Sequence, residues 1–295
     1  MTDRNNQDRF SGSPPQIENV PQQVQQTMHD SVQRQQQHMQ FAVPTEFVDL
    51  PSKGKYYPEG HPLKDKDSVE IKYMTAKEED ILSSTNLIKK GVVFERLLQS
   101  VLVDRIDPND FLIGDKNAIL VSTRINGYGP EYQTEVKCPS CSNTSRYVFD
   151  LNNLTSKMNI DKQFMDSMNV EETERGTFKI NLDRLNHTIE VKPLNGHDEK
   201  RIAHLAGIKT KNNFVEGVVT DTLKTFIVSV NGDTNPATIG AFVDSLPARE
   251  SRTIRTIYKH IVPKIEILSP YSCANCGYEQ ELEVPINSDF FWPNE

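Results

Sequence analysis

Long apolar runs are missing from this sequence of 295 residues. A membrane-spanning helix needs about 18 consecutive apolar residues, and no segment approaches that length. The first ten residues, MTDRNNQDRF, also lack the apolar stretch of a secretory signal. We therefore expect a soluble protein, in the cytoplasm of the cell that produces it.

An excess of basic residues is absent as well. The formal net charge is −8 at pH 7, whereas a nucleic-acid-binding module generally needs a basic surface to displace phosphate counterions. This charge disfavours a general nucleic-acid binder. The chain is long enough for one or two domains with an apolar core.

Recognisable catalytic motifs are also lacking. The sequence contains no G-x-S-x-G, H-E-x-x-H or G-x-G-x-x-G. His197 and His204 fall on one predicted helix, but seven residues of helix separate them by about 10 Å, too far to share a metal ion. Lys209-Thr210 lacks the glycine-rich loop that precedes such a pair in a phosphate-binding site. The sequence therefore indicates a protein that is not an enzyme.

The first 44 residues have a composition of their own. Eleven of the first forty residues are Gln and three are Pro, which leaves too little apolar surface to offset the entropy of ordering. We predict a disordered Gln-rich arm over residues 1–44. The alternative is a helix that docks on a partner, since apolar residues recur at every fourth position: Val20, Val24, Met28 and Val32.

Residues 45–128 are predicted to form a mainly helical subdomain. Residues 69–73 alternate like a strand, and Thr75 with Glu78 matches a capping box. Asp107-Pro108 resembles a helix start, and a helix over 118–125 is expected to stop at Gly127. Another helix is expected from the apolar positions Phe94, Leu97, Leu98, Val101 and Leu102.

Residues 129–295 are predicted to form an α+β subdomain closed by two zinc-knuckle hairpins. A helix from residue 195 is expected to close at Gly207, and others are expected over 213–224 and 248–261. The expected strands cover 132–137, 147–151, 177–182, 188–194, 265–271 and 279–285. The predicted fold class is therefore α+β, with a helical N-terminal half and a hairpin-rich C-terminal half that carries a split, zinc-ribbon-like site.

The four cysteines of the chain form two C-x-x-C motifs: Cys138, Cys141, Cys273 and Cys276. Each motif falls at the turn of a predicted hairpin, and Gly277 follows the second, where a zinc knuckle often needs a positive φ. Four thiolates predict a closed, structural Zn²⁺ site without catalytic function. About 130 residues separate the motifs, so the intervening segment must fold with its ends close together. The alternatives are four unliganded thiols or two separate redox dithiols.

A basic stripe runs along the predicted helix 248–261. It consists of Arg249, Arg252, Arg255 and Lys259. Such a stripe is typical of a phosphate-binding face, or of a solvated face or protein contact. The acidic residues of the following segment favour the second interpretation, since residues 277–295 contain five acidic residues and no basic one.

Several strings of this sequence resemble the baseplate hub proteins of T-even-type, contractile-tailed bacteriophages. They are FVDLPSKG at 47–54 with Tyr57-Pro58, YMTAKEEDIL at 73–82, LIKKG at 87–91, IGDK at 113–116 and DFFWP at 289–293. The resemblance covers residues 46–295. It implies a non-enzymatic subunit that helps to build the baseplate hub at the tip of the tail tube, in the host cytoplasm during assembly or in the virion.

The expected partners follow from that resemblance. They are other baseplate hub or tail proteins, with further copies of the chain in an oligomer. Phe290, Phe291 and Trp292 are candidate docking residues, because large aromatic side chains are favoured anchors at interfaces. The alternative is that these rings pack on their own domain. A zinc-ribbon nucleic-acid-binding or transcription accessory protein remains the alternative function.

Overall fold

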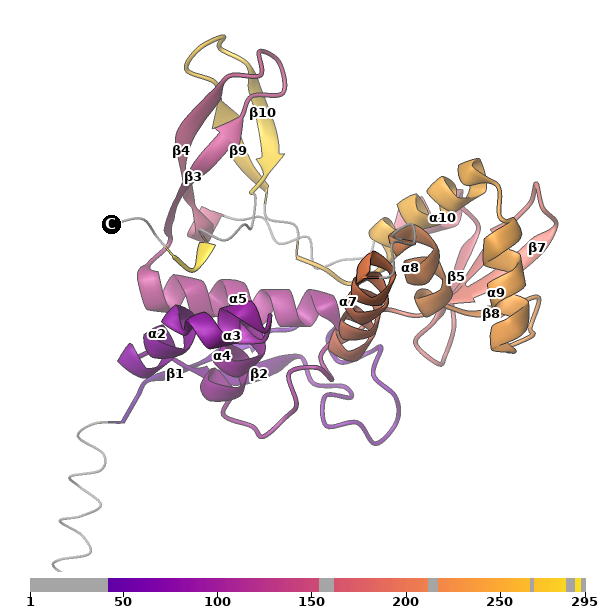
Figure 1. Cartoon of the computed structure of the whole chain (residues 1–295), viewed down its shortest axis with the longest axis horizontal. Helices are drawn as coiled ribbons and strands as arrows, with labels where there is room; N and C mark the ends of the chain where they lie inside the picture. The colour runs from indigo at the N-terminus through magenta and orange to yellow at the C-terminus, as the bar shows by residue number, and fades with distance from the viewer. Residues whose placement is uncertain (1–41, 154–161, 212–216, 266–267, 285–289, 293–295) are drawn as a thin grey trace, which may run out of the picture. The chain divides into compact units, whose positions relative to one another are not determined.

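The computed structural model describes residues 42–153, 162–211, 217–265, 268–284 and 290–292 (Figure 1). The chain divides into two units, Met1–Pro44 and Thr45–Glu295. The apolar stripe from Val20 to Val32 lies outside the described residues, as does almost all of the predicted Gln-rich arm. Every helix and strand given below belongs to the second unit.

The second unit begins with a hairpin and a group of helices. Strands β1 (Thr45–Asp49) and β2 (Ser68–Lys72) pair antiparallel. The predicted capping box is present, since the Thr75 backbone N–H donates to the Glu78 carboxylate at 2.9 Å. The helices are α2 (Ala76–Ser83), α3 (Thr85–Lys89), α4 (Val93–Val101) and α5 (Ile113–Tyr128).

Two further hairpins lie side by side, and we call them the hairpin pair (Figure 1). The Tyr147 hydroxyl of the first donates to the Pro270 carbonyl of the second at 3.0 Å, and the Tyr147 and Tyr271 ring centroids are 5.1 Å apart. Both hairpins are antiparallel. Their strands are β3 (Glu131–Lys137) with β4 (Thr144–Asp150), and β9 (Leu268–Ser272) with β10 (Glu279–Glu283).

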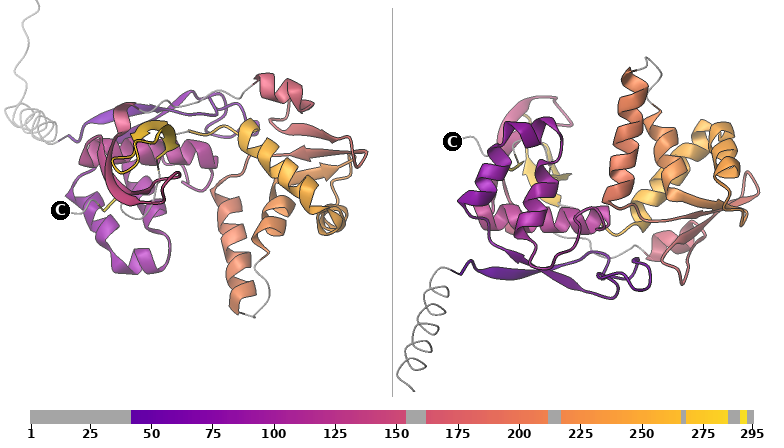
Figure 2. Two further views of the ribbon diagram at one scale, coloured as in Figure 1. Left: turned by 90° about the horizontal axis from the view of Figure 1, so that it is seen from above. Right: turned by 60° about the horizontal axis from the view of Figure 1, so that its bottom comes forward.

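The residues between the hairpins, 162–262, build what we call the sheet subdomain. Its antiparallel sheet has the order β5-β6-β7-β8, and helices α8, α9 and α10 cover one face of it (Figure 2). Alternate residues of β6 are buried, as a sheet with one covered face requires. The elements are α6 (Lys162–Ser167), β5 (Val170–Glu172), β6 (Phe178–Leu182), β7 (His187–Val191), α7 (Gly196–Lys211), α8 (Val218–Phe226), β8 (Ile227–Val230), α9 (Pro236–Ser245) and α10 (Ala248–Ile261).

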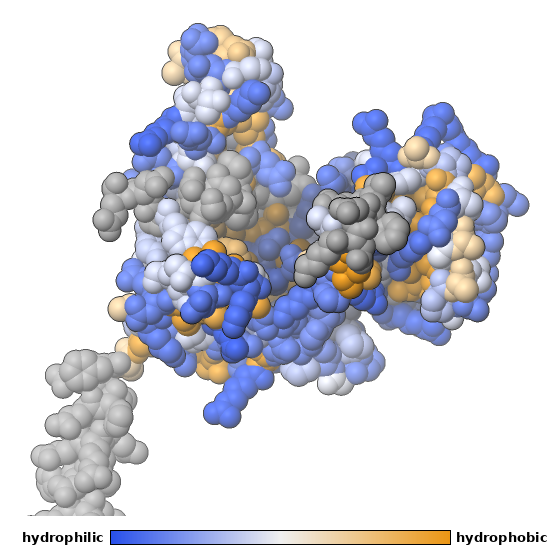
Figure 3. All heavy atoms as spheres, viewed as in Figure 1, coloured by the Kyte–Doolittle hydropathy of each residue, from blue (hydrophilic) through white to orange (hydrophobic). Residues whose placement is uncertain are grey.

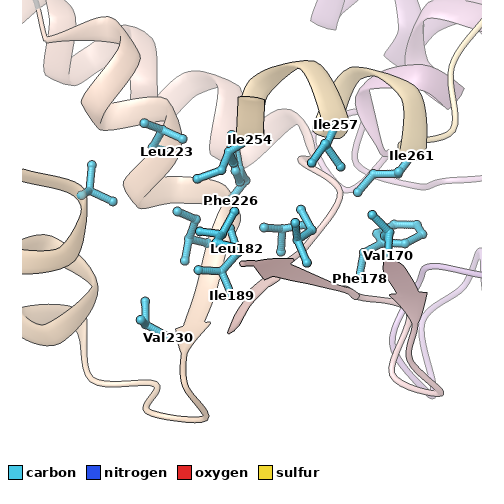
Figure 4. Packing of buried hydrophobic residues seen from close by; sticks show 14 of the residues in the cluster. Val170, Phe178, Leu182, Ile189, Leu223, Phe226, Val230, Ile254, Ile257 and Ile261 are labelled. Atoms are coloured by element: carbon cyan, nitrogen blue, oxygen red, sulfur yellow. The ribbon is translucent and has the colours of Figure 1, made fainter. Parts of the chain in front are cut away.

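Apolar side chains of the described residues gather in three clusters. One belongs to the sheet subdomain, where Phe226 and Ile257 point toward strand residues such as Ile189 (Figure 4). Another joins the hairpin pair to the helices before it, with Leu97 and Phe149 both buried in it. A third lies between the β1–β2 hairpin, α4 and α5. The second cluster contains residues from both sides of residue 128, and the subdomain boundary there stays a prediction.

The α+β class is confirmed, but three predicted helix limits are wrong. Helix α5 passes through Gly127, whose lack of a Cβ lets Met74 approach, and ends before Gly129 with φ 81°. Helix α7 passes through Gly207 to Lys211, and the Lys209 ammonium binds the Asp221 carboxylate of α8 at 2.6 Å. Asp107-Pro108 opens a turn instead of a helix, because the Asp107 carboxylate accepts the nearby Asn109 backbone N–H at 2.9 Å.

Candidate metal centre

The two C-x-x-C motifs meet at the tips of the hairpin pair. The Cys138 and Cys276 sulfur atoms are 3.8 Å apart, as are those of Cys141 and Cys273. All four sulfur atoms lie within 4.8 Å of one another. Each 3.8 Å distance joins one hairpin to the other, so the motifs face a common point.

The turns that carry these cysteines have matching backbones. The Cys138 backbone N–H donates to the Asn143 carbonyl at 2.9 Å, and the Cys273 backbone N–H donates to the Tyr278 carbonyl at 2.9 Å. Each turn places the residue after its second cysteine in the left-handed region. Gly277 has φ 67°, as the sequence predicts, and Ser142 has φ 58° without the freedom of a glycine. The turns are therefore two copies of one knuckle.

The sulfur separations fit a zinc ion. A tetrahedron with zinc–sulfur bonds of about 2.3 Å has sulfur–sulfur edges of about 3.8 Å. The Cys138–Cys276 and Cys141–Cys273 sulfur separations have this length, which is far longer than the roughly 2.05 Å of a disulfide bond. Four thiolates complete the tetrahedron and leave no open position, so Cys138, Cys141, Cys273 and Cys276 suit a structural ion that contributes to folding.

Hydrogen bonds to the thiols shift their ionisation. The backbone N–H groups of Cys276 and Asn275 lower the pKa of Cys273 to about 6. The Asn143 backbone N–H, together with the Asn275 side-chain amide, lowers the pKa of Cys141. The Tyr278 backbone N–H is the largest single influence on the pKa of Cys276 and lowers it, but desolvation and the hydrogen bonds with the three neighbouring thiols together outweigh it and raise the pKa to about 11. Four ionised thiols at this spacing repel one another, and a bound dication is the charge that would offset this repulsion.

The inner wall of the site is aromatic. Cys138 and Cys273 are buried, whereas Cys141 and Cys276 are exposed. The buried Tyr271 hydroxyl makes no hydrogen bond within the described residues, and burial together with the adjacent Cys273 raises its pKa to about 12. Most of the surface in view over the hairpin pair is hydrophilic (Figure 3). The four-cysteine site therefore lies between an apolar core and solvent.

A buried arginine on α5 joins the other end of the hairpin pair to the helices. The Arg124 side chain is 1% exposed, and its guanidinium donates to the carbonyls of Phe290 at 2.5 Å, Gly129 at 2.8 Å and Glu131 at 3.1 Å. Burial lowers its pKa, while Tyr128 and Tyr132 act in the opposite direction. The guanidinium thus connects the start of β3 with the segment after β10. No sequence pattern predicts this buried position, because a helical arginine usually faces solvent.

The aromatic residues near the C-terminus pack inside their own chain. Phe290 and Phe291 are buried, and Trp292 is half-buried with its indole N–H donating to the Leu82 carbonyl at 3.1 Å. Their rings pack against neighbours such as Phe94, whose ring centroid lies 5.3 Å from that of Phe291. This is the second of the two alternatives drawn from the sequence, and the structure gives no support to an exposed docking role for these rings.

The family model described as T4 bacteriophage base plate protein matches residues 43–292. The chain belongs to this family. Membership implies a structural role in the phage baseplate, a place in the virion tail and contacts with other tail proteins. The search of curated proteins and the search of solved structures returned no match. No helix in the described residues has the length and apolarity to cross a membrane.

Two of the strings that resemble baseplate proteins meet in this family member around one buried carboxylate. Asp115 is fully buried and accepts hydrogen bonds from the Ser52 backbone N–H at 2.9 Å, the Ser52 hydroxyl at 2.6 Å and the Tyr57 hydroxyl at 2.7 Å. Burial raises the pKa of Asp115, although these hydrogen bonds counteract it. The neighbouring Gly114 has no room for a side chain, since a Cβ there would lie 2.1 Å from the Pro263 carbonyl oxygen. These residues join distant segments, which is a structural role.

Proposed function

We propose that this baseplate protein is a non-enzymatic subunit of the central hub, or an assembly factor for it, that acts by docking other hub proteins and holds a structural zinc ion. The family membership over residues 43–292 is the observation that carries the proposal. The strings resembling hub proteins support the hub in particular. The mutual approach of four sulfur atoms to within 4.8 Å supports the zinc ion.

The charge of the hairpin pair supports docking of protein over nucleic acid. Its strands and turns contain six acidic residues and two basic ones, a net charge of −4. A nucleic-acid-binding zinc ribbon needs the opposite sign to displace counterions. The acidic residues are Glu131, Glu135, Asp150, Glu279, Glu281 and Glu283, and the basic residues are Lys137 and Arg146.

Fractionation of phage assembly intermediates tests the location. A phage that lacks this gene is complemented with a tagged copy, and hub subassemblies, complete tails and virions are then analysed by quantitative mass spectrometry. We expect the tagged chain in the hub subassembly. Its persistence in virions indicates a permanent subunit, and its loss there indicates an assembly factor. Recovery only with peripheral baseplate parts contradicts the hub assignment.

Two measurements on the purified full chain test the remaining parts of the proposal. Elemental analysis should give one zinc per chain, and a preparation that folds without any bound metal contradicts the structural zinc. Binding of DNA and RNA is measured in the same buffer at low and high salt. Tight, salt-dependent binding would favour the nucleic-acid alternative over protein docking.

A further inference from the structure

One face of α10 carries four cations that have no acidic partner among the described residues. Glu250, Ile254, Ile257 and Ile261 are buried on the inner side of this helix. The outer side exposes the basic row, which we define as Arg249, Arg252, Arg255 and Lys259. Many other surface cations are paired at close range, as Lys116 is with Glu199 and Lys200 with Glu95, both at 2.6 Å. Other exposed cations of the described residues, such as Lys89 and Lys90, also lack an ion pair, so the basic row is distinguished by the alignment of four cations along one helix face.

Strand β10 carries a matching row of anions. The acidic row, which we define as Glu279, Glu281 and Glu283, occupies alternate positions of the strand and is exposed. The intervening Leu282 is half-buried against the core, so the acidic row lies on the outward face. The residues across the hairpin from this row are the uncharged Ser272, Pro270 and Leu268. No ion pair of the described residues includes any member of the acidic row.

The two rows have similar lengths, and the like charges within each row repel one another. Ten residues of helix separate the ends of the basic row by about 15 Å, and four residues of strand separate the ends of the acidic row by about 13 Å. Neighbouring charges within each row lie closer than the Debye length of about 8–10 Å, so they are not fully screened. Contact between the rows would offset the repulsion in both.

We propose that copies of this chain associate head to tail, with the basic row of one copy against the acidic row of the next. Within one chain the rows belong to different core clusters, α10 to that of the sheet subdomain and β10 to that of the hairpin pair, and no ion pair joins them in the described residues. Each copy offers one row of each sign, so the contact is heterologous and forms a ring or an open chain. This inference does not depend on the location of the protein in the hub.

Sedimentation velocity of the zinc-loaded full chain tests the proposal over a range of concentrations at 50 and 500 mM salt. We expect association at low salt that weakens at high salt. Arg252→Glu with Arg255→Glu, or Glu279→Lys with Glu281→Lys, should each raise the dissociation constant about tenfold or more. Lys89→Glu with Lys90→Glu, at the last residue of α3 and its C-cap, is the matched control for the arginine variant, because it makes the same charge change on exposed residues and should leave association unchanged.

A mixture of the two double variants gives the sharpest test. Each variant alone should associate at least tenfold more weakly than the wild type. In the mixture, the unaltered acidic row of one variant meets the unaltered basic row of the other, and the two reversed rows also complement each other, so the mixture should form complexes again. Recovery also shows that both variants are folded. A wild-type chain that stays monomeric at low salt, or a mixture that stays monomeric while both variants keep their zinc and circular dichroism, overturns the proposal. Nucleic-acid binding that depends on Arg252 and Arg255, without self-association, also overturns it.

Discussion

The hairpin pair and the sheet subdomain are held together by different interactions. Among its described residues, the sheet subdomain buries seventeen hydrophobic side chains in one cluster. The hairpin pair consists of two two-stranded sheets, and an isolated two-stranded hairpin is at best marginally stable in water. Its tips bring four free cysteines together, and Arg124 binds its other end. We therefore expect the hairpin pair to depend on polar and metal contacts that the sheet subdomain does not need.

Removal of the metal should have the largest effect and should separate the two regions. Cys273→Ser, or treatment with a chelator, is expected to abolish zinc binding and to expose the amides of β3, β4, β9 and β10 to hydrogen exchange. Structural zinc sites contribute about 10–16 kcal/mol of apparent binding free energy in small zinc fingers. The sheet subdomain should keep its protection, because its core contains no cysteine.

Ala274→Ser is the matched control for Cys273→Ser, since it introduces a serine into the same knuckle and leaves all four thiols in place. It should retain one zinc per chain and the wild-type exchange pattern. Equal loss of protection in both regions after chelation would contradict the comparison, as would a hairpin pair whose protection is unchanged in the metal-free chain.

Truncation of the core in the sheet subdomain should give the converse result. Phe226 is buried and stacks on the Tyr258 ring at a centroid distance of 4.1 Å. Phe226→Ala should cost about 3–5 kcal/mol of unfolding free energy, because it leaves a cavity. Denaturant unfolding measures this loss, and elemental analysis should still find one zinc per chain. Loss of zinc from this variant at low denaturant would show that the two regions unfold as one.

Replacement of Arg124 tests the polar attachment of the hairpin pair to α5. Arg124→Met keeps much of the side-chain volume but leaves the carbonyls of Phe290, Gly129 and Glu131 without this donor. Each buried carbonyl left unpaired costs about 1–3 kcal/mol, less where water can enter. We expect a loss of about 2–4 kcal/mol, with faster hydrogen exchange at the start of β3 and no loss of zinc.

Arg124→Lys is the informative companion variant. It retains the positive charge but lacks the planar group that reaches three acceptors at once. Its stability should therefore lie between those of the wild type and Arg124→Met. A lysine variant as stable as the wild type would indicate that charge alone, and not the geometry of the guanidinium, fixes the hairpin pair.

The sequence predicted helices and strands well. It predicted contacts between distant segments only where the residue type implies a shared site, as the cysteines do. Cysteine spacing brought together motifs 132 residues apart, and alternating residues predicted both hairpins. The short elements β1, β5, β8, α6 and α9 were missed, since three to ten residues carry little periodicity. Arg124, Asp115 and the burial of Phe290 depend on segments that meet only in the folded chain, so local pattern could not reveal them.

The smallest expected effect concerns the left-handed residue that follows the second cysteine of each knuckle. Ser142 and Gly277 occupy equivalent positions with φ 58° and 67°. The left-handed region costs a residue with a Cβ about 1–2 kcal/mol of conformational free energy, and it costs glycine little. Ser142→Gly should therefore stabilise the chain by up to about 1 kcal/mol, and Gly277→Ser should destabilise it by a similar amount. Thermal unfolding of the zinc-loaded chains measures both shifts.

The two substitutions act on backbone conformation with little contribution from contacts. A Cβ at Gly277 would have no atom within 4 Å, so a clash does not account for a loss of stability there. The double variant, which exchanges glycine and serine between the knuckles, should return close to the wild-type stability if the knuckles are equivalent. A double variant that is much less stable than the wild type would show that the second knuckle contributes more to stability than the first. The two hairpins would then contribute unequally to the shared site.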